Sequence, residues 1–251
     1  YSFFNFISMD LSFVTRKFQR SIAGLSLLAI LASFAGFTGT AFAKTFSDVS
    51  SSSFAYDQID ALSDAGIMTG VGDGTLFDPN GYTTREQVAK VLVEAFVGSV
   101  DTSYDAGFSD VMDGQWYTDY VNTAALYGIF SGNPDGTFGV GDYINRADLA
   151  KTVVAAAGLE SSIWGSDKFS DVPVGSYYDS AVGTAWAYSV VDGTSSTTYN
   201  PGGNATREQL AKIVYNSMNP VYRGDETGTD NGNTGSADAT VMVEVSDDTP
   251  E

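Results

Sequence analysis

Apolar residues return every three or four positions in six segments of the chain. The segments are residues 54–67, 86–97, 116–129, 147–157, 177–190 and 208–218. This spacing is typical of amphipathic helices that bury one face. Because no single helix can bury its own stripe, the pattern predicts an all-α fold in which helix pairs pack together.

The second helix of each pair is preceded by residues that favour a helix start. Thr84-Arg85-Glu86-Gln87 and Thr206-Arg207-Glu208-Gln209 have the form of a capping box, with a hydroxyl before the helix and Gln three residues later. Asn145-Arg146-Ala147-Asp148 is a looser version of the same start. Each arginine is therefore expected at the first helical position.

The first helix of each pair is followed by stop and turn signals. Gly66 and Gly128 stand where a left-handed cap belongs, and Ser189 holds that place in the third copy as a weaker stop. Asp73-Gly74 and Asp135-Gly136 then mark turns, which the third copy lacks. We expect a loop between the two helices of every pair.

The tetrapeptide Phe-Ser-Asp-Val occurs three times, at Phe46, Phe108 and Phe169, with starts 62 and 61 residues apart. The arginines of the second helices are spaced by 61 and 61 residues. A fixed period of this length indicates one supersecondary unit that was copied and packs on its own copies. We expect three helix-loop-helix repeats around a common axis, at residues 44–98, 108–158 and 169–218.

Residues 1–43 have the features of an export signal, with Met9 as the expected start. Three basic residues come first: Arg16, Lys17 and Arg20. An apolar run at 22–37 follows, and Ala41-Phe42-Ala43 fits a cleavage site. A membrane anchor is the alternative interpretation, but Ser, Gly and Thr interrupt the apolar run and favour the export signal.

The composition changes after the third repeat. Residues 219–238 are rich in Gly, Asp, Thr and Asn, without an apolar pattern, and are expected to form a flexible acidic linker. Residues 239–245 alternate as in a β-strand. A lone strand has nothing to pair with, so we interpret 239–251 as the truncated start of a β-rich region.

The chain has no Cys and no His, and its net charge is −19 at pH 7. It therefore lacks disulfides, thiol nucleophiles, imidazole bases and the usual zinc and non-haem iron ligands. The Asp-Gly loops lack the alternating acidic ligands of a calcium-binding EF-hand, so we expect no metal and no cofactor. The strongly negative net charge also argues against a nucleic-acid partner, because contacts to phosphates need a basic surface.

Six of the nine cations that follow residue 43 form three equivalent pairs, each with Lys five residues after Arg. The pairs are Arg85 with Lys90, Arg146 with Lys151, and Arg207 with Lys212. A cation in the first helical turn opposes the helix dipole at a cost of about 0.3–1 kcal/mol. An arginine at this place in all three copies therefore needs an explanation.

Several interpretations of these cations are open. For the lysines we favour ion pairs with acids on their own helices, namely Glu86, Asp148 and Glu208. The arginines can pair with an Asp of a neighbouring repeat, or they can form an anion site. We favour the anion site, because a guanidinium beside the free N–H groups of a helix N-terminus suits a carboxylate or phosphate.

Two further sets of residues recur in the three repeats. An aromatic residue at the start of each first helix is expected mainly in the core, with Trp116 as the candidate for stacking on a sugar: Phe54, Trp116 and Tyr177. The acid of each Phe-Ser-Asp-Val motif is expected to brace the turn into the first helix and is also a candidate ligand-binding residue: Asp48, Asp110 and Asp171.

On these motifs the chain resembles the S-layer homology family, in which three tandem modules anchor exported proteins to the bacterial cell wall. The matching residues, within 45–218, are the Phe-Ser-Asp-Val motifs, the turns Gly66-Ile67 and Gly128-Ile129, the loops 70–77 and 132–138, and the helix start that the family writes Thr-Arg-Ala-Glu. The resemblance implies a three-pronged pseudo-trimer. It also implies that Arg85, Arg146 and Arg207 reach an acidic, often pyruvylated, secondary cell-wall polysaccharide in grooves between repeats.

We therefore expect a non-enzymatic module at the cell wall or cell surface, whose partner is a cell-wall polysaccharide or a peptidoglycan-linked glycan. One alternative is a structural unit of the S-layer that makes protein–protein contacts, including self-association. Another is the anchor of an enzyme encoded downstream. A glycosidase within the repeats is disfavoured because no acidic pair recurs in them. No membrane partner is expected after signal cleavage.

Overall fold

The computed structural model describes residues 46–160 and 166–223, and within them the fold is helical. The elements are α2 (Tyr56–Asp64), α3 (Arg85–Phe96), α4 (Thr118–Leu126), α5 (Arg146–Ala157), a short 3₁₀ helix (Ser166–Lys168), α6 (Asp179–Ala187) and α7 (Arg207–Met218). The predicted all-α class is confirmed. Among the described helices, none has the length and apolar character to cross a membrane. The export signal and the β-rich region expected at the two ends lie outside the described residues.

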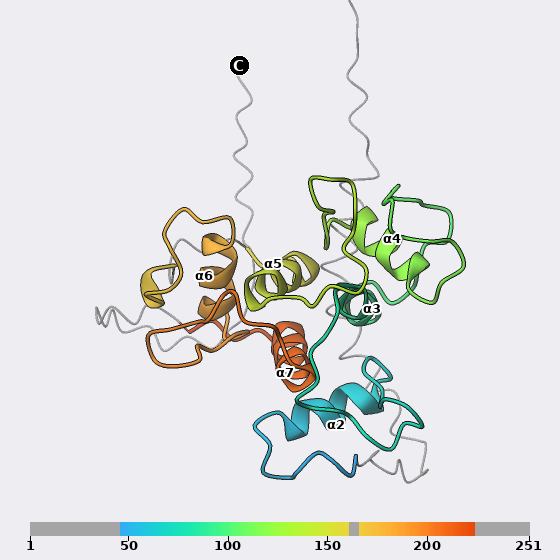
Figure 1. The fold of residues 1–251 in the computed structure, drawn as a ribbon. Coiled ribbons are helices and arrows are strands. Elements are labelled where there is room, and N and C mark those ends of the chain that lie inside the picture. Colours follow the sequence, from blue (N-terminus) through green and yellow to red (C-terminus); the bar gives the residue numbers. More distant parts are fainter. Residues whose placement is uncertain (1–45, 161–165, 224–251) are drawn as a thin grey trace, which may run out of the picture.

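The six α-helices of the described residues form a central group, α3, α5 and α7, and an outer group, α2, α4 and α6 (Figure 1). The central helices α3, α5 and α7 contact one another, and each outer helix packs on the central helix of the preceding repeat. Thus α4 packs on α3 and α6 on α5, while α2 of the first repeat packs on α7 of the third. Each packed pair of an outer and a central helix therefore combines two repeats. The pairing of α2 with α7 joins the first repeat to the third, so the three repeats form a closed circle.

A ring of backbone hydrogen bonds joins the three segments that lead into the central helices. The amide of Thr83 donates to the carbonyl of Ala205 at 3.1 Å. The Ala205 amide donates to Ile144 at 3.0 Å, and the Ile144 amide donates to Thr83 at 3.0 Å. Because the three bonds form a closed cycle, they fix the pseudo-threefold relation and bring the N-termini of the central helices together.

The central helices begin at the arginines, as their capping sequences predict. The side chain of Asn145 accepts a hydrogen bond from the amide of Asp148 at 2.7 Å at the start of α5. In α3 the Gln87 side chain accepts from the amide of Thr84 at 3.1 Å. These local bonds satisfy amides that the helix itself leaves without partners.

The outer helices end in a left-handed residue in all three repeats. Gly66 and Gly128 have φ angles of 72° and 66°, and Ser189 adopts the same conformation at 57°. After α2, the amide of Ile67 donates to the carbonyl of Leu62 at 2.9 Å, as in a Schellman motif. The stop predicted at these positions is confirmed, and the third repeat makes it without glycine.

The aromatic residues expected at the start of the outer helices lie outside the core, contrary to the prediction. Their exposed fractions are 55% for Phe54, 54% for Trp116 and 65% for Tyr177. Each of them precedes its helix, and the next residue is the N-cap that turns inward: Ala55, Tyr117 and Tyr178. The apolar stripe thus begins one residue later than expected, which leaves three aromatic faces in solvent.

Candidate functional site

Each repeated arginine reaches into the loop of the following repeat, where its guanidinium donates to two backbone carbonyls. The Nε bonds are Arg85 to Phe138 at 2.8 Å, Arg146 to Tyr199 at 2.9 Å and Arg207 to Phe77 at 2.7 Å. The Nη2 bonds are Arg85 to Ser131 at 3.4 Å, Arg146 to Asp192 at 3.0 Å and Arg207 to Thr69 at 2.9 Å. The arginines therefore tie each repeat to the next around the closed circle.

The same guanidinium groups lie over buried aromatic rings. Their central carbons are 5.1 Å from the ring of Phe138, 4.5 Å from that of Tyr199 and 4.7 Å from that of Phe77. The carbonyl dipoles and the ring faces offset the unfavourable field of the helix N-terminus. Burial also lowers the pKa of Arg207, against the opposing charges of Asp78 and Asp48.

The alternative that the arginines pair with acids of a neighbouring repeat holds in part. In the described residues such a pair joins Arg85 Nη1 to the Asp148 carboxylate, at the long distance of 3.8 Å. The Nη1 atoms of Arg146 and Arg207 have no hydrogen-bond partner within the described part of the chain. Two guanidinium groups thus keep donors that a ligand can use.

The backbone amides of the three arginines already have hydrogen-bond partners. The expectation that these N–H groups bind an anion is therefore wrong. The amide of Arg85 donates to the carbonyl of Asp142 at 3.0 Å, and that of Arg146 to Gly203 at 2.9 Å. The amide of Arg207 donates in the same way to Gly81 at 2.9 Å. Neighbouring repeats therefore occupy these three backbone donors, and the side chains of the arginines are the groups of these residues that remain available to an anion.

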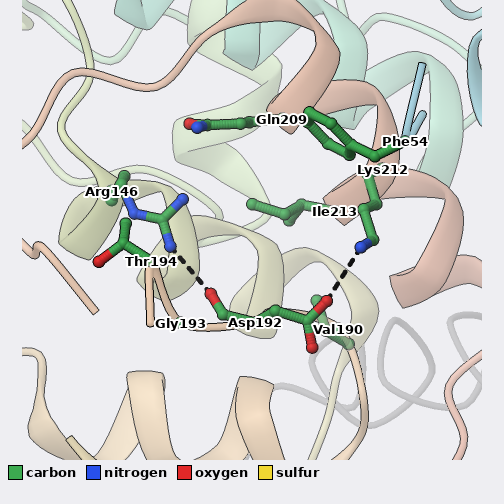
Figure 2. Close-up of a pocket in the computed structure, with 9 residues that line it drawn as sticks. All are labelled: Phe54, Arg146, Val190, Asp192, Gly193, Thr194, Gln209, Lys212 and Ile213. Atoms are coloured by element: carbon green, nitrogen blue, oxygen red, sulfur yellow. Dashed lines mark hydrogen bonds and ion pairs between the residues drawn. The ribbon is translucent and has the colours of Figure 1, made fainter. Parts of the chain in front are cut away.

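A pocket of about 210 Å³ lies where three repeats meet around Arg146 (Figure 2). Phe54 comes from the first repeat and Arg146 from the second, while Asp192, Gln209 and Lys212 come from the third. We call it the Arg146 pocket. The equivalent positions around the other two arginines are called the Arg85 site and the Arg207 site.

The lysines contact aromatic rings and do not form the ion pairs expected within their helices. Lys212 Nζ lies 5.5 Å from the ring centre of Phe54, and Lys151 Nζ lies 5.7 Å from that of Tyr177. Lys90 Nζ lies 5.6 Å from the ring of Tyr120, on the helix that follows Trp116. The expected acidic partners turn elsewhere: Glu86 accepts from the Gly141 amide, Glu208 from the Ser53 hydroxyl and Asp148 from the Tyr177 hydroxyl.

Trp116, the candidate for stacking on a sugar, is accessible. Its ring packs edge-on against Tyr117 at 5.5 Å, while about half of the residue stays exposed. It directly precedes α4, which packs on α3, the helix that carries Lys90. The structure thus places an exposed aromatic residue beside a lysine-bearing central helix in all three repeats.

The acids of the Phe-Ser-Asp-Val motifs brace the loop before the central helix, and not the turn into the outer helix as expected. Asp48 accepts from the amides of Phe77 and Asp78 at 2.8 and 2.7 Å. Asp110 and Asp171 hold the corresponding loops, at Phe138 and Tyr199. Partial burial raises the pKa of Asp48 and of Asp110, but the amide bonds outweigh it and hold each pKa below its ordinary value. These carboxylates therefore fix the carbonyls that receive the arginines.

Among the described residues, no group of three or more acidic side chains is placed to hold a metal ion. The features of the site that the sequence interpretation missed are the receiving carbonyls, the exposed faces of Phe54 and Tyr177, and the carboxylate of Asp192 in the pocket. A repeat alignment carries a signal for Asp192, because the other repeats have Thr69 and Ser131 at its place. The receiving carbonyls leave no such signal in the sequence, because every residue has a backbone carbonyl.

Comparison with known proteins places these repeats in one family. A family model described as the S-layer homology domain matches residues 45–89, 107–150 and 168–211. The chain belongs to the S-layer homology domain family. The three matched segments agree in number and order with the three predicted repeats.

Relatives of different kinds share this S-layer homology region. An S-layer protein of Bacillus thuringiensis subsp. finitimus is 25% identical over 80% of this chain and 24% of its own length. An amylopullulanase of Thermoanaerobacterium thermosulfurigenes is 28% identical over 68% of this chain and 9% of its own length. Exoglucanase XynX of Acetivibrio thermocellus is 27% identical over 68% of this chain and 16% of its length. The chain thus spans less than a quarter of these relatives, and the family points to a location at the cell surface.

Proposed function

We propose that the three modules form a non-enzymatic anchor that binds an anionic polysaccharide of the cell wall at the sites between repeats. In each site the guanidinium of Arg85, Arg146 or Arg207 supplies N–H donors for a carboxylate, such as that of a pyruvylated sugar. The exposed faces of Phe54, Trp116 and Tyr177 supply apolar surface for the sugar ring.

The observation that carries the proposal is the grouping of cations with exposed aromatic faces in a chain whose net charge is −19. In the Arg146 pocket, the guanidinium of Arg146 and the ammonium of Lys212 lie around one cavity beside Phe54. A sugar carboxylate needs charged donors, and the sugar ring needs an apolar face, so the pocket offers both. The same residue classes recur at the other two sites.

The relatives support an anchoring role because proteins of different kinds share these modules. Some are named as S-layer proteins, and others are named as enzymes that act on polysaccharides, yet they share the same modules. A module common to proteins of such different names is expected to supply what they have in common, which is attachment. The modules themselves need no catalytic group for that.

Several weak sites on one polymer give a firm attachment. A single carboxylate held at a half-exposed site binds weakly, but sites on one rigid body that engage one polysaccharide raise the overall affinity by about 10² to 10⁴. The closed circle of repeats holds the sites at fixed separations. We therefore expect long polysaccharide to bind much more tightly than a short fragment of it.

A matched pair of lysine variants tests the proposal. Lys90→Gln removes a cation at the Arg207 site, and Lys168→Gln removes one beside Trp186, in a neighbouring cavity that none of the three repeated arginines lines. Each variant changes the net charge by one. We expect Lys90→Gln to lower the affinity for purified anionic wall polysaccharide about threefold to tenfold, since one charge-assisted contact is lost. Lys168→Gln is expected to bind like the unaltered protein.

Titration calorimetry with the polysaccharide provides the measurement, and circular dichroism checks that both variants remain folded. Equal affinities for the two variants would contradict binding at these sites. A protein that binds a neutral glycan as tightly as the acidic one would contradict the role of the arginines.

The S-layer relatives favour a second candidate, a structural unit that contacts other proteins of the layer. An exposed aromatic pair, Tyr82 and Tyr143, lies edge-on with ring centres 5.5 Å apart and offers a surface for such contacts. Attachment to walls from which the polysaccharide has been chemically removed would favour this candidate over glycan binding.

A further inference from the structure

Asp192 brings a carboxylate into the Arg146 pocket that the other two sites do not have at that place. The carbonyls that receive the Nη2 atoms of the three arginines belong to Thr69, Ser131 and Asp192, so these residues occupy equivalent positions. Thr69 and Ser131 are neutral. The third repeat therefore differs by one negative charge at the edge of its site.

The Asp192 carboxylate is held between two cations. One oxygen accepts from Lys212 Nζ at 2.9 Å, and the other accepts from Arg223 Nη2 at 2.7 Å. Figure 2 shows Asp192 between Arg146, which bonds its backbone carbonyl, and Lys212, which bonds its carboxylate. Asp192 thus forms an ion pair with Lys212, whose ammonium group would otherwise be available in the pocket.

Arg223 is fixed independently of this carboxylate. Its Nε donates to the carbonyl of Trp186 at 2.7 Å and its amide to that of Ala187 at 2.7 Å. Its guanidinium also lies 5.3 Å from the ring centre of Trp186. The segment after α7 therefore returns to the end of α6 and carries a second cation to Asp192.

Asp192 remains charged at neutral pH. Partial burial raises its pKa, but the hydrogen bonds from Lys212 and Arg223 outweigh burial and hold the pKa below the ordinary value. About half of the side chain, 52%, stays exposed. The carboxylate is therefore a fixed negative charge that also faces whatever enters the pocket.

The other two sites lack this arrangement. In the Arg85 site, the Asp148 carboxylate lies 3.8 Å from Arg85 Nη1 and accepts hydrogen bonds from the side chains of Tyr177 and Asn145. Lys151 contacts the ring of Tyr177. In the Arg207 site, no ion pair within 4.0 Å involves Arg207 or Lys90 in the described chain. The lysine is paired with a carboxylate in the Arg146 pocket alone among the three described sites.

We infer that Asp192 is a built-in counter-ion that weakens the binding of carboxylate ligands in the Arg146 pocket, so that acidic sugar binds more tightly at the Arg207 site, where no ion pair within 4.0 Å engages the cations of that site in the described chain. The inference rests on the proposed function for its ligand. A sugar carboxylate entering the pocket must displace Asp192 from Lys212 or lie beside it, and both raise the free energy of the bound state. Asp192 thus lowers the share of the polysaccharide that the Arg146 pocket binds.

Asp192→Ser tests the inference, because serine is the residue that the second repeat has at this place. The backbone carbonyl that receives Arg146 is kept, and the Lys212 ammonium is freed. The probe is sodium glucuronate, and the readout is the shift of the Arg146 and Lys212 side-chain NMR signals during titration. We expect the affinity at the pocket to rise about tenfold in the variant, as one charge-assisted hydrogen bond becomes available to the ligand.

Two control variants separate the counter-ion from other effects. Asp64→Ser removes an exposed acid from the last turn of α2, away from the pocket, and changes the net charge equally. Arg223→Gln loosens the segment after α7 but leaves Asp192 on Lys212. We expect neither variant to gain glucuronate at the pocket. A gain in either that equals that of Asp192→Ser, or no gain in Asp192→Ser itself, overturns the inference.

Titration with purified acidic wall polysaccharide distinguishes this inference from the proposed function. If the unaltered protein binds polysaccharide and Asp192→Ser binds it with the same affinity and the same perturbed residues, the inference fails while the function stands. If neither protein binds polysaccharide but Asp192→Ser still gains glucuronate at Lys212, the proposed function fails and the counter-ion role of Asp192 is supported.

Discussion

The arginine at the first helical position combines an assembly role with a recognition role in one side chain. Its Nε and Nη2 atoms hold the next repeat through carbonyls, and its stem lies in a largely buried place, with Arg146 only 6% exposed. The Nη1 atoms of Arg146 and Arg207 have no hydrogen-bond partner in the described part of the chain, and the proposed function assigns recognition to them. A lysine offers a point charge without this fork and serves one role at a time.

The left-handed residue after each outer helix allows a prediction at the residue scale. Ser189 has φ 57°, a conformation in which a side chain costs about 1 kcal/mol that glycine does not incur. Ser189→Gly should therefore raise the free energy of unfolding by about 0.5–1 kcal/mol, and the reverse change Gly128→Ala should lower it by about 1 kcal/mol. Urea denaturation followed by circular dichroism gives both values. Changes of the same sign in the two variants would contradict the explanation.

At the scale of the elements, the sequence predicted where the central helices begin because capping is local. The bonds that start α5 lie within four residues, and so do their sequence signals. The partner of each helix could not be predicted in this way. An apolar stripe specifies a buried face but does not say whether the covering helix belongs to the same repeat or to the preceding one.

The candidate site was predictable to the same extent. The period of 61 residues singled out Arg85, Arg146 and Arg207 by position and charge. Their receiving groups are carbonyls of loops that Asp48, Asp110 and Asp171 hold in place, and a carbonyl is present at every residue of a sequence. The helical stripe predicts core positions for the three exposed aromatics, because a stripe shifted by one residue has almost the same spacing of apolar residues.

The contacts between repeats allow a prediction at this scale. Arg146→Gln removes the hydrogen bonds to Tyr199 and Asp192 and leaves two carbonyls and a ring without their cation. We expect the free energy of unfolding to fall by about 2–3 kcal/mol, since bonds to charged donors contribute about that much at a buried position. Lys212→Gln, a matched loss of one charge at the surface of the same pocket, should cost less than about 1 kcal/mol. Urea denaturation compares the two variants, and equal losses would contradict the assembly role of Arg146.

At the scale of the whole molecule, the three repeats form one closed body and not a row of modules. Because α2 packs on α7 and the hydrogen-bonded ring at Thr83, Ile144 and Ala205 is cyclic, every repeat supports the other two. A linear array has two free ends, whereas this arrangement has none. The sites between repeats therefore exist only when all three repeats are folded together.

The charge of the whole molecule leads to opposite effects of salt on stability and on binding. The chain has 31 acidic and 12 basic residues, so like charges repel across the folded body, while the cations of the sites attract an anionic ligand. From about 0.1 M to about 1 M NaCl the Debye length falls from about 10 Å to about 3 Å, which screens both interactions. We expect the melting temperature to rise and the affinity for acidic wall polysaccharide to fall over this range. Thermal denaturation and calorimetry of one protein preparation measure the two trends, with a neutral polysaccharide as the reference for binding. If affinity and melting temperature moved in the same direction, attraction between the arginine sites and a negatively charged ligand could not be what holds the polysaccharide.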